Sequence, residues 1–335
     1  SIYIQDSYLS DGKNLERTQI FNTDGDFLGA YDVALPSFDM KGNSYRLVLK
    51  SKTPPEDNST SYDYIFGLQK MDSNADLLKE WEIKGEESTL CSSPGFCSYS
   101  KSGPIISSLA INSKDDIYYL NYYSDNYGQY LSLNRQSLAS TTPNVLINKV
   151  PAVGVANLLV DSRDFTYMGF FEDSNNLNNS GRKMAVYDKA FELIGHIYQT
   201  FSYPNSLYDH GYVASATDKF NKLYLLNNQR LEVYTPALSL KAPTLISAKV
   251  MDAKGTVKLT WTDRTSDESG FNIKVCSGQG VNCADKDMIT VKTVGANRTS
   301  AVLPALAVQG SGVIKTFRMT SLKGNEESLV SNELE

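Results

Sequence analysis

Hydrophobic and polar residues alternate with a period of two along most of this 335-residue chain. The clearest example is the segment 257–275, in which two alternating runs flank a polar turn at residues 263–270. In the first run, Val257, Leu259 and Trp261 are separated by lysine and threonine. This alternation predicts a β-strand that is buried on one face and solvated on the other.

Similar short runs fill the last quarter of the chain. About seven strands within roughly 95 residues are typical of a two-sheet sandwich. Trp261 is large enough to form the centre of a small core between two such sheets. The predicted strands are residues 242–250, 257–261, 271–275, 290–294, 300–303, 314–321 and 328–332.

Residues 242–335 resemble a fibronectin type III domain of the kind often attached to secreted bacterial proteins. The resemblance rests on Trp261, on the Trp-Thr-Asp and Glu-Ser-Gly-Phe sequences within 261–271, and on the closing Glu-Ser-Leu-Val-Ser-Asn at 327–332. Domains of this family are usually spacers or binding modules. The resemblance therefore implies little about activity.

Residues 1–240 contain no amphipathic helical pattern longer than two turns. Clusters of short strands recur instead at intervals of about 45 to 50 residues, the period expected for propeller blades. Each repeat has a strand, an Asp/Asn turn, a tyrosine-containing strand, a polar loop and two further strands. A single four-stranded sheet cannot bury both faces alone, so stacking around an axis is expected. The pattern resembles NHL-like and related β-propellers; a long pair of β-sandwiches or a β-solenoid is the alternative.

The first repeat lacks an opening strand, and the fifth lacks a closing one. The N-terminal strand could complete the fifth blade and close the ring, which is the arrangement we prefer. Residues upstream of Ser1 could instead belong to a larger ring, or another chain could complete the open edge and make this an assembling subunit. We expect an all-β protein: a β-propeller of about five blades in residues 1–240, then a fibronectin type III-like β-sandwich in residues 241–335.

The chain carries 32 basic and 38 acidic residues, a formal net charge of -6. This balance disfavours nucleic acid and anionic membranes as partners. The sequence has no apolar run of about 18 residues, so we expect no membrane-spanning helix. It begins with serine and shows no signal peptide, which fits a mature, processed or truncated protein.

Four cysteines fall in two close pairs, each enclosing glycine and polar turn residues. Cys91 with Cys97, and Cys276 with Cys283, are predicted to form two local disulfides. A zinc site is the alternative, but it would require both pairs to converge, and neither has zinc-ribbon spacing. Two disulfides indicate an oxidising compartment, so we expect a secreted, cell-surface or periplasmic protein.

The sequence singles out no catalytic residue. Of the two histidines, His196 lies in a strand pattern and is predicted to be a wall or core residue, whereas His210 lies in a connecting loop and is the better candidate for a binding site. No G-x-S-x-G motif occurs, and nothing distinguishes a glycosidase-like pair among the carboxylates, Glu80 with Glu82 for example.

Aspartates gather in the predicted turns. Their hard oxygen ligands suit calcium, which is the cofactor that this sequence could hold, although none matches the twelve-residue calcium loop. Aspartate is also the residue that ordinarily caps a hairpin, which is the structural interpretation and the one we prefer. The aspartates concerned are Asp24, Asp26, Asp115, Asp116, Asp161 and Asp164.

Three long polar loops, residues 50–62, 121–129 and 171–182, would emerge on one face of a propeller. Their tyrosines could stack on sugar rings or anchor a protein partner, or the loops could be simple solvated connections. We expect a non-enzymatic extracellular binding or adhesion protein for a glycan or protein; the alternatives are a self-associating structural subunit and a carbohydrate-active enzyme. The candidate tyrosines are Tyr62, Tyr64, Tyr122, Tyr123 and Tyr127.

Overall fold

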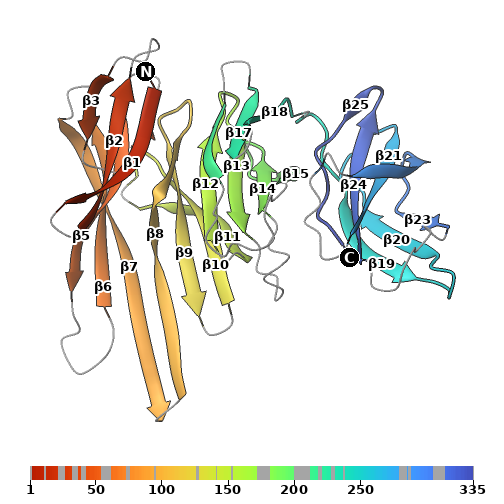
Figure 1. Ribbon diagram of the computed structural model, residues 1–335, viewed down its shortest axis with the longest axis horizontal. Coiled ribbons are helices and arrows are strands. Elements are labelled where there is room, and N and C mark those ends of the chain that lie inside the picture. Colours follow the sequence, from red (N-terminus) through yellow and green to blue (C-terminus); the bar gives the residue numbers. More distant parts are fainter. Residues whose placement is uncertain are drawn as a thin grey trace. The chain divides into compact units, whose positions relative to one another are not determined.

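The protein is built from β-strands, with no α-helix in the residues that this computed structural model describes (Figure 1). The sheets are antiparallel, and none of the described sheets closes into a barrel. The predicted all-β class is therefore confirmed. The described residues are 2–10, 13–21, 27–31, 37–38, 43–53, 62–72, 76–93, 96–125, 128–140, 142–151, 154–171, 182–199, 212–217, 221–227, 231–236, 238–278, 285, 288–304 and 314–334.

The chain divides into two compact units. Unit 1 comprises Ser1–Ala152 and Leu158–Val160, and unit 2 comprises Val153–Asn157 and Asp161–Glu335. The boundary expected between residues 240 and 241 lies inside unit 2 and stays a prediction.

Unit 1 contains a three-stranded sheet, β1-β2-β3, and an eight-stranded sheet that runs in chain order from β4 to β11. Within each sheet, every strand pairs with its neighbours in sequence, because short turns favour antiparallel hairpins. The strands are β1 (Ile2–Ser10), β2 (Lys13–Phe21), β3 (Phe27–Tyr31), β4 (Ser37–Phe38), β5 (Ser44–Thr53), β6 (Tyr62–Met71), β7 (Leu77–Ser93), β8 (Phe96–Ile111), β9 (Ile117–Asp125), β10 (Gly128–Gln136) and β11 (Asn144–Pro151).

A long hairpin joins the two halves of the eight-stranded sheet. Strand β7 pairs with β6 from Leu77 to Glu87 and with β8 from Glu86 to Ser93. The hairpin extends well beyond the neighbouring strands (Figure 1). The serines, glutamates and glycines between residues 84 and 105 do not alternate clearly, so the hydrophobic pattern does not predict this hairpin.

The two halves, β4–β7 and β8–β11, share a hydrophobic core. Ser37 at the start of β4 donates a hydrogen bond from its Oγ to the carbonyl oxygen of Leu109 on β8 at 2.6 Å, which ties the halves together. Burying each large apolar side chain contributes ~1.5–3 kcal/mol. The core residues are Tyr45, Leu47, Leu68, Trp81 and Ile83 from β5–β7, with Leu109, Ile117 and Tyr119 from β8 and β9.

Two smaller sheets that are also ordered along the chain follow, β12-β13-β14-β15 and β16-β17-β18; apart from the end of β12, they belong to unit 2. The second has one strand fewer than the first. These strands are β12 (Gly154–Val160), β13 (Thr166–Phe171), β14 (Arg182–Tyr187), β15 (Leu193–Gln199), β16 (Tyr212–Thr217), β17 (Leu223–Asn227) and β18 (Leu231–Tyr234).

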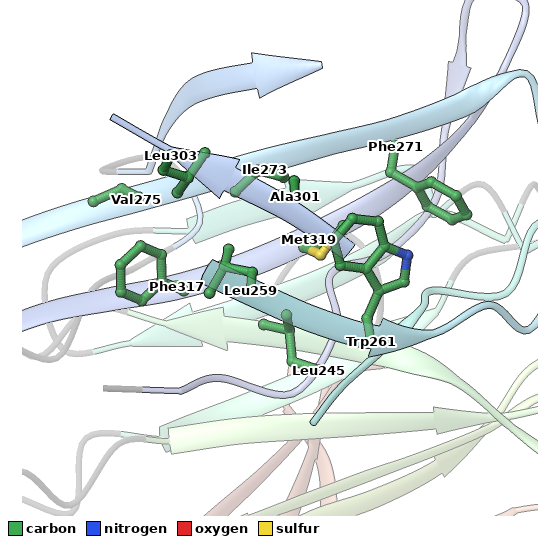
Figure 2. Packing of buried hydrophobic residues seen from close by; sticks show 10 residues of the cluster. All are labelled: Leu245, Leu259, Trp261, Phe271, Ile273, Val275, Ala301, Leu303, Phe317 and Met319. Carbon is green, nitrogen blue, oxygen red and sulfur yellow. The ribbon is translucent and has the colours of Figure 1, made fainter. Parts of the chain in front are cut away.

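The rest of unit 2 is a sandwich of two sheets, β19-β20-β23 and β22-β21-β24-β25. Both sheets contribute side chains to one core, in which the rings of Trp261 and Phe271 meet edge to face at 5.7 Å (Figure 2). The central position predicted for Trp261 is confirmed, since it is 2% exposed. The strands are β19 (Thr244–Val250), β20 (Val257–Thr262), β21 (Gly270–Gly278), β22 (Ile289–Gly295), β23 (Ser300–Leu303), β24 (Ile314–Lys323) and β25 (Glu326–Glu327).

The strand expected at residues 328–332 is not a regular one. This segment follows β24, but serine hydroxyls replace backbone carbonyls in the ladder. The amide of Ser321 donates to Ser328 Oγ, and that of Met319 donates to Ser331 Oγ, both at 2.9 Å. Side chains that compete for backbone hydrogen bonds interrupt the strand.

Candidate functional site

Three aromatic side chains follow one another on the same face of β6. Tyr62, Tyr64 and Phe66 are two residues apart, so the strand directs them to one side. The rings of Tyr64 and Phe66 stack with centroids 6.2 Å apart and an interplanar angle of 25°. The Nζ atom of Lys52 on β5 lies 4.1 Å from the ring centroid of Tyr62 and 5.2 Å from that of Tyr64. We call these four residues the β6 aromatic strip.

Glycines in the long hairpin make room for this strip. A methyl group added to Gly85 on β7 would lie 3.1 Å from Phe66 Cε2 and 2.7 Å from the carbonyl oxygen of Ser102. One added to Gly103 on β8 would lie 3.3 Å from the same carbon of Phe66. The Phe66 ring thus covers bare backbone where two strands approach closely, an arrangement that requires glycine.

The strand register relates the tyrosines of β9 to the strip. Tyr64 pairs with Gly85, and Gly103 pairs with Tyr122, while the two glycines are themselves in contact. Directly opposed residues share a face of a sheet. Tyr64 and Tyr122 therefore lie in one row on the same face, with two glycines between them.

Tyr123 lies on the opposite face, because consecutive residues of a strand alternate. It pairs with Tyr130 on β10, and the ring centroids are 6.3 Å apart. The structure thus brings Tyr62, Tyr64 and Tyr122 to one face and leaves Tyr123 on the other.

Tyr62, Tyr122 and Tyr123 lie on strands rather than in the predicted loops, and Tyr64 lies on β6. Tyr62 begins β6, and β9 continues to Asp125, so most of the expected loop 121–129 is a hairpin. Tyr127 and His210 lie outside the described residues. His196 is 6% exposed on β15, which confirms its prediction as a wall or core residue.

One hairpin turn recurs in both units. In each copy an Asn or Asp side chain accepts hydrogen bonds on Oδ1 from the amides two and four residues later, at 2.8–3.0 Å. The residue at the third position after it has a positive φ of 62–82°. Such Asx turns stabilise tight hairpins. Within the residues that the structure describes, the copies begin at Asn112, Asp161, Asp188 and Asp252.

The hydrogen bonds of these turns are those that the structural interpretation of the aspartates expects. The Asp161 side chain is fully buried and also accepts hydrogen bonds on Oδ2 from Arg163 at 2.7 Å and from the Tyr167 hydroxyl at 3.2 Å. Asp115 and Asp164 are the positive-φ residues of their turns. Within the described residues, no three His, Cys, Asp or Glu side chains gather as they would around a metal ion. Asp24 and Asp26 lie outside these residues.

Glu80 belongs to a chain of polar contacts across β5, β6 and β7. Gln69 donates to its Oε2 at 2.6 Å and Lys50 to its Oε1 at 2.5 Å, while Lys50 also lies 3.6 Å from Glu82. The hydrogen bonds from Gln69 and Lys50 lower the pKa of Glu80 below its usual value. A glycosidase acid needs a raised pKa instead, so Glu80 does not suit that role.

The register places Cys91 directly opposite Cys97 in the hairpin of β7 and β8. Cys276 is buried on β21, and Cys283 lies outside the described residues. No free thiol occurs among the cysteines whose side chains are described. This register is compatible with the predicted Cys91–Cys97 disulfide. Both predicted disulfides stay predictions.

The sequence matches no protein-family model and no curated protein. The part of the chain that the structure describes contains no helix long and apolar enough to cross a membrane.

Proposed function

We propose that this chain is a non-enzymatic extracellular or cell-surface binding protein, with a β-propeller followed by a fibronectin type III-like domain. Sheets that run in chain order, with two consecutive halves sharing a core, support the propeller. The strand orders β19-β20-β23 and β22-β21-β24-β25 support the type III-like sandwich. An immunoglobulin-like sandwich and a propeller are both common scaffolds for binding.

The observation that carries the proposal is the β6 aromatic strip. Tyr62, Tyr64 and Phe66 are partly exposed and Lys52 is exposed, and all four lie on strands, so their positions are set before a ligand arrives. Tyrosine offers a large apolar face and a polar hydroxyl at a small cost in conformational entropy. The apolar face of a sugar ring stacks on such a surface, while hydroxyl groups and the Lys52 ammonium satisfy the polar edge. We therefore propose a glycan as the ligand.

The test is binding of soluble hexasaccharides of cellulose, chitin and mannan, followed by NMR titration of the intact chain. Tyr64→Ala should weaken binding about 2- to 13-fold, since a stacked aromatic contact contributes ~0.5–1.5 kcal/mol. Tyr224→Ala on β17, outside the strip, is the matched control and should bind as the wild type does. If Tyr64→Ala bound each hexasaccharide equally well, the strip would not be the site.

A second function, as a subunit of an extracellular assembly, is favoured by the edge of β18. Leu231 and Val233 of this edge strand are 56% and 52% exposed. Exposed apolar edge strands template association with other strands. Light scattering at micromolar concentration separates the two functions. A mass of one chain supports the binding protein, whereas regular oligomers that dissociate in a Val233→Lys variant support assembly.

A further inference from the structure

A fully buried arginine lies where the sandwich meets the β12–β15 sheet. Arg318 on β24 is 1% exposed, and its guanidinium carbon lies 3.5 Å from the ring centroid of Tyr198 on β15. It donates to Asp285 Oδ1 at 3.0 Å and to Glu333 Oε2 at 2.8 Å. The two carboxylates come from separate segments, one between β21 and β22 and the other near the end of the chain.

The same residues hold β15 against the sandwich. The amide of Tyr198 donates to Asp285 Oδ2 at 3.1 Å, and the amide of His196 donates to the carbonyl oxygen of Val330 at 2.9 Å. Asp285 thus bonds both sides of this contact, Arg318 in the sandwich and the β15 backbone. A change in the charge of Asp285 therefore alters the hydrogen bonds that hold β15 against the sandwich.

The cluster has one cation and two carboxylates, which leaves an excess of one negative charge. Burial makes an uncompensated charge costly. Within the residues that the structure describes, the other charged or titratable groups near Asp285 are Lys274 on β21, which pairs with Glu327 at 2.9 Å, and the side chains of Tyr198 and His196 on β15. The side chains of Asp285 and Glu333 are 26% and 30% exposed, so protons from solvent reach them.

We propose that this cluster is a proton-linked contact, in which Asp285 takes up one proton as the solution becomes mildly acidic and thereby tightens the contact between β15 and the sandwich. The protonated carboxyl keeps an oxygen for the Tyr198 amide. Arg318 and ionised Glu333 then form a neutral pair.

The pKa of Asp285 is consistent with proton uptake in mildly acidic solution. Burial raises the pKa of Asp285 from its ordinary 3.8 to about 6, against the opposing effects of Arg318, the Tyr198 amide and Lys274. Between these two values the folded chain holds a proton that the unfolded chain has released. Stability from this group is therefore greatest at acidic pH and falls as the pH rises through about 6.

The direct test is an NMR titration of the Tyr198 amide in the intact chain. Its chemical shift should follow Asp285 with a midpoint near pH 6, and the step should vanish in Asp285→Asn. Glu333→Gln removes the excess charge and should move the midpoint to lower pH. A wild-type midpoint at or below pH 4 would overturn the proposal.

Urea unfolding gives an independent measure. The unfolding constant of the wild type, divided by that of Asp285→Asn, should rise about tenfold from pH 5 to pH 8 for a single proton with these values. Glu326→Gln, an exposed carboxylate in the same sandwich, is the control and should give no such change. A ratio that is constant or falls with pH would show that attraction by Arg318 outweighs burial, and the proposal would fail.

Discussion

At the scale of the residue, two aspartates that open the same kind of turn contribute differently to stability. Asp161 and Asp188 open the same kind of turn, and each accepts hydrogen bonds from two backbone amides. Asp161 is also buried and bonds Arg163 and Tyr167. Burial and the additional partners make one turn residue more important than the other, although both are equally visible in the sequence.

We predict that Asp161→Ala lowers the free energy of unfolding by ~2–3 kcal/mol, because it removes the turn hydrogen bonds and also leaves the buried Tyr167 hydroxyl without its acceptor. Asp188→Ala removes the same turn hydrogen bonds at a half-exposed position and should cost ~1 kcal/mol, the usual value for a lost cap. Urea unfolding followed by tyrosine fluorescence measures both variants. Equal losses would mean that the contacts with Arg163 and Tyr167 contribute nothing.

Glu268, the first residue of the Glu-Ser-Gly-Phe sequence, holds neighbouring segments of the sandwich together. Its buried carboxylate accepts hydrogen bonds from the Asn297 amide at 2.9 Å and the Thr265 hydroxyl at 2.8 Å. Burial opposes ionisation, but these hydrogen bonds outweigh it and lower the pKa of Glu268. The ionised form is therefore the one that stabilises the fold.

Because folding lowers the pKa of Glu268, the contribution of this residue to stability depends on pH. The stabilisation is fully present above the unfolded pKa of about 4.5 and is lost as the pH falls through the lower folded value. We expect Glu268→Gln to lower the free energy of unfolding by ~1–2 kcal/mol at pH 7 and by less at pH 3. Urea midpoints at the two pH values test this, and an equal loss at both would contradict it.

At the scale of the element, strands that approach another backbone closely have no room for a side chain at the point of contact. Gly195 on β15 faces the C-terminal segment of the sandwich. A methyl group added there would lie 2.7 Å from Leu329 Cβ and 2.9 Å from the carbonyl oxygen of Val330. These atoms belong to or adjoin the backbone, so they cannot move aside without shifting the segment.

Gly195→Ala should therefore lower the melting temperature, at a cost of ~1–3 kcal/mol for an overpacked position. Gly295→Ala on β22 is the matched control, because a methyl group there meets nothing within 4 Å. That change should stay within ~0.5 kcal/mol. Calorimetry of the two variants compares them, and a harmless Gly195→Ala would mean that β15 and the sandwich separate easily.

At the scale of the whole molecule, the sandwich and the strands β13 to β18 belong to the same compact unit. Backbone hydrogen bonds join the sandwich, and the segment that enters it, to strand β15. The amide of Ala242 donates to the carbonyl oxygen of Ile194 at 2.8 Å, and that of His196 donates to Val330. Because of these bonds, we expect the sandwich and β15 to unfold together.

We predict that residues 193–199 and 326–334 lose hydrogen-exchange protection at the same urea concentration. Exchange measured by mass spectrometry in increasing urea follows both segments in one sample. Residues of the sandwich core, such as Ile273 and Met319, provide the reference for global opening. Loss of protection in 193–199 well before 326–334 would identify two independent domains with a boundary near residue 240.

The sequence by itself determined the all-β class, most strand positions and the turns, because alternation and the hydrogen-bonding preference of Asp and Asn are local properties. It also placed Trp261 at the centre of a core and His196 in a strand. It named Tyr62, Tyr64 and Tyr122 as candidates without indicating that they lie on strands of one sheet face.

Only the tertiary structure decided which of these residues meet. Phe66 covers Gly85 and Gly103 because a long hairpin sets the register across β6 to β9. Arg318 meets Asp285 and Tyr198 because separate sheets pack together. Such pairings join residues far apart in the chain, and alternation alone carries no information about which strands become neighbours.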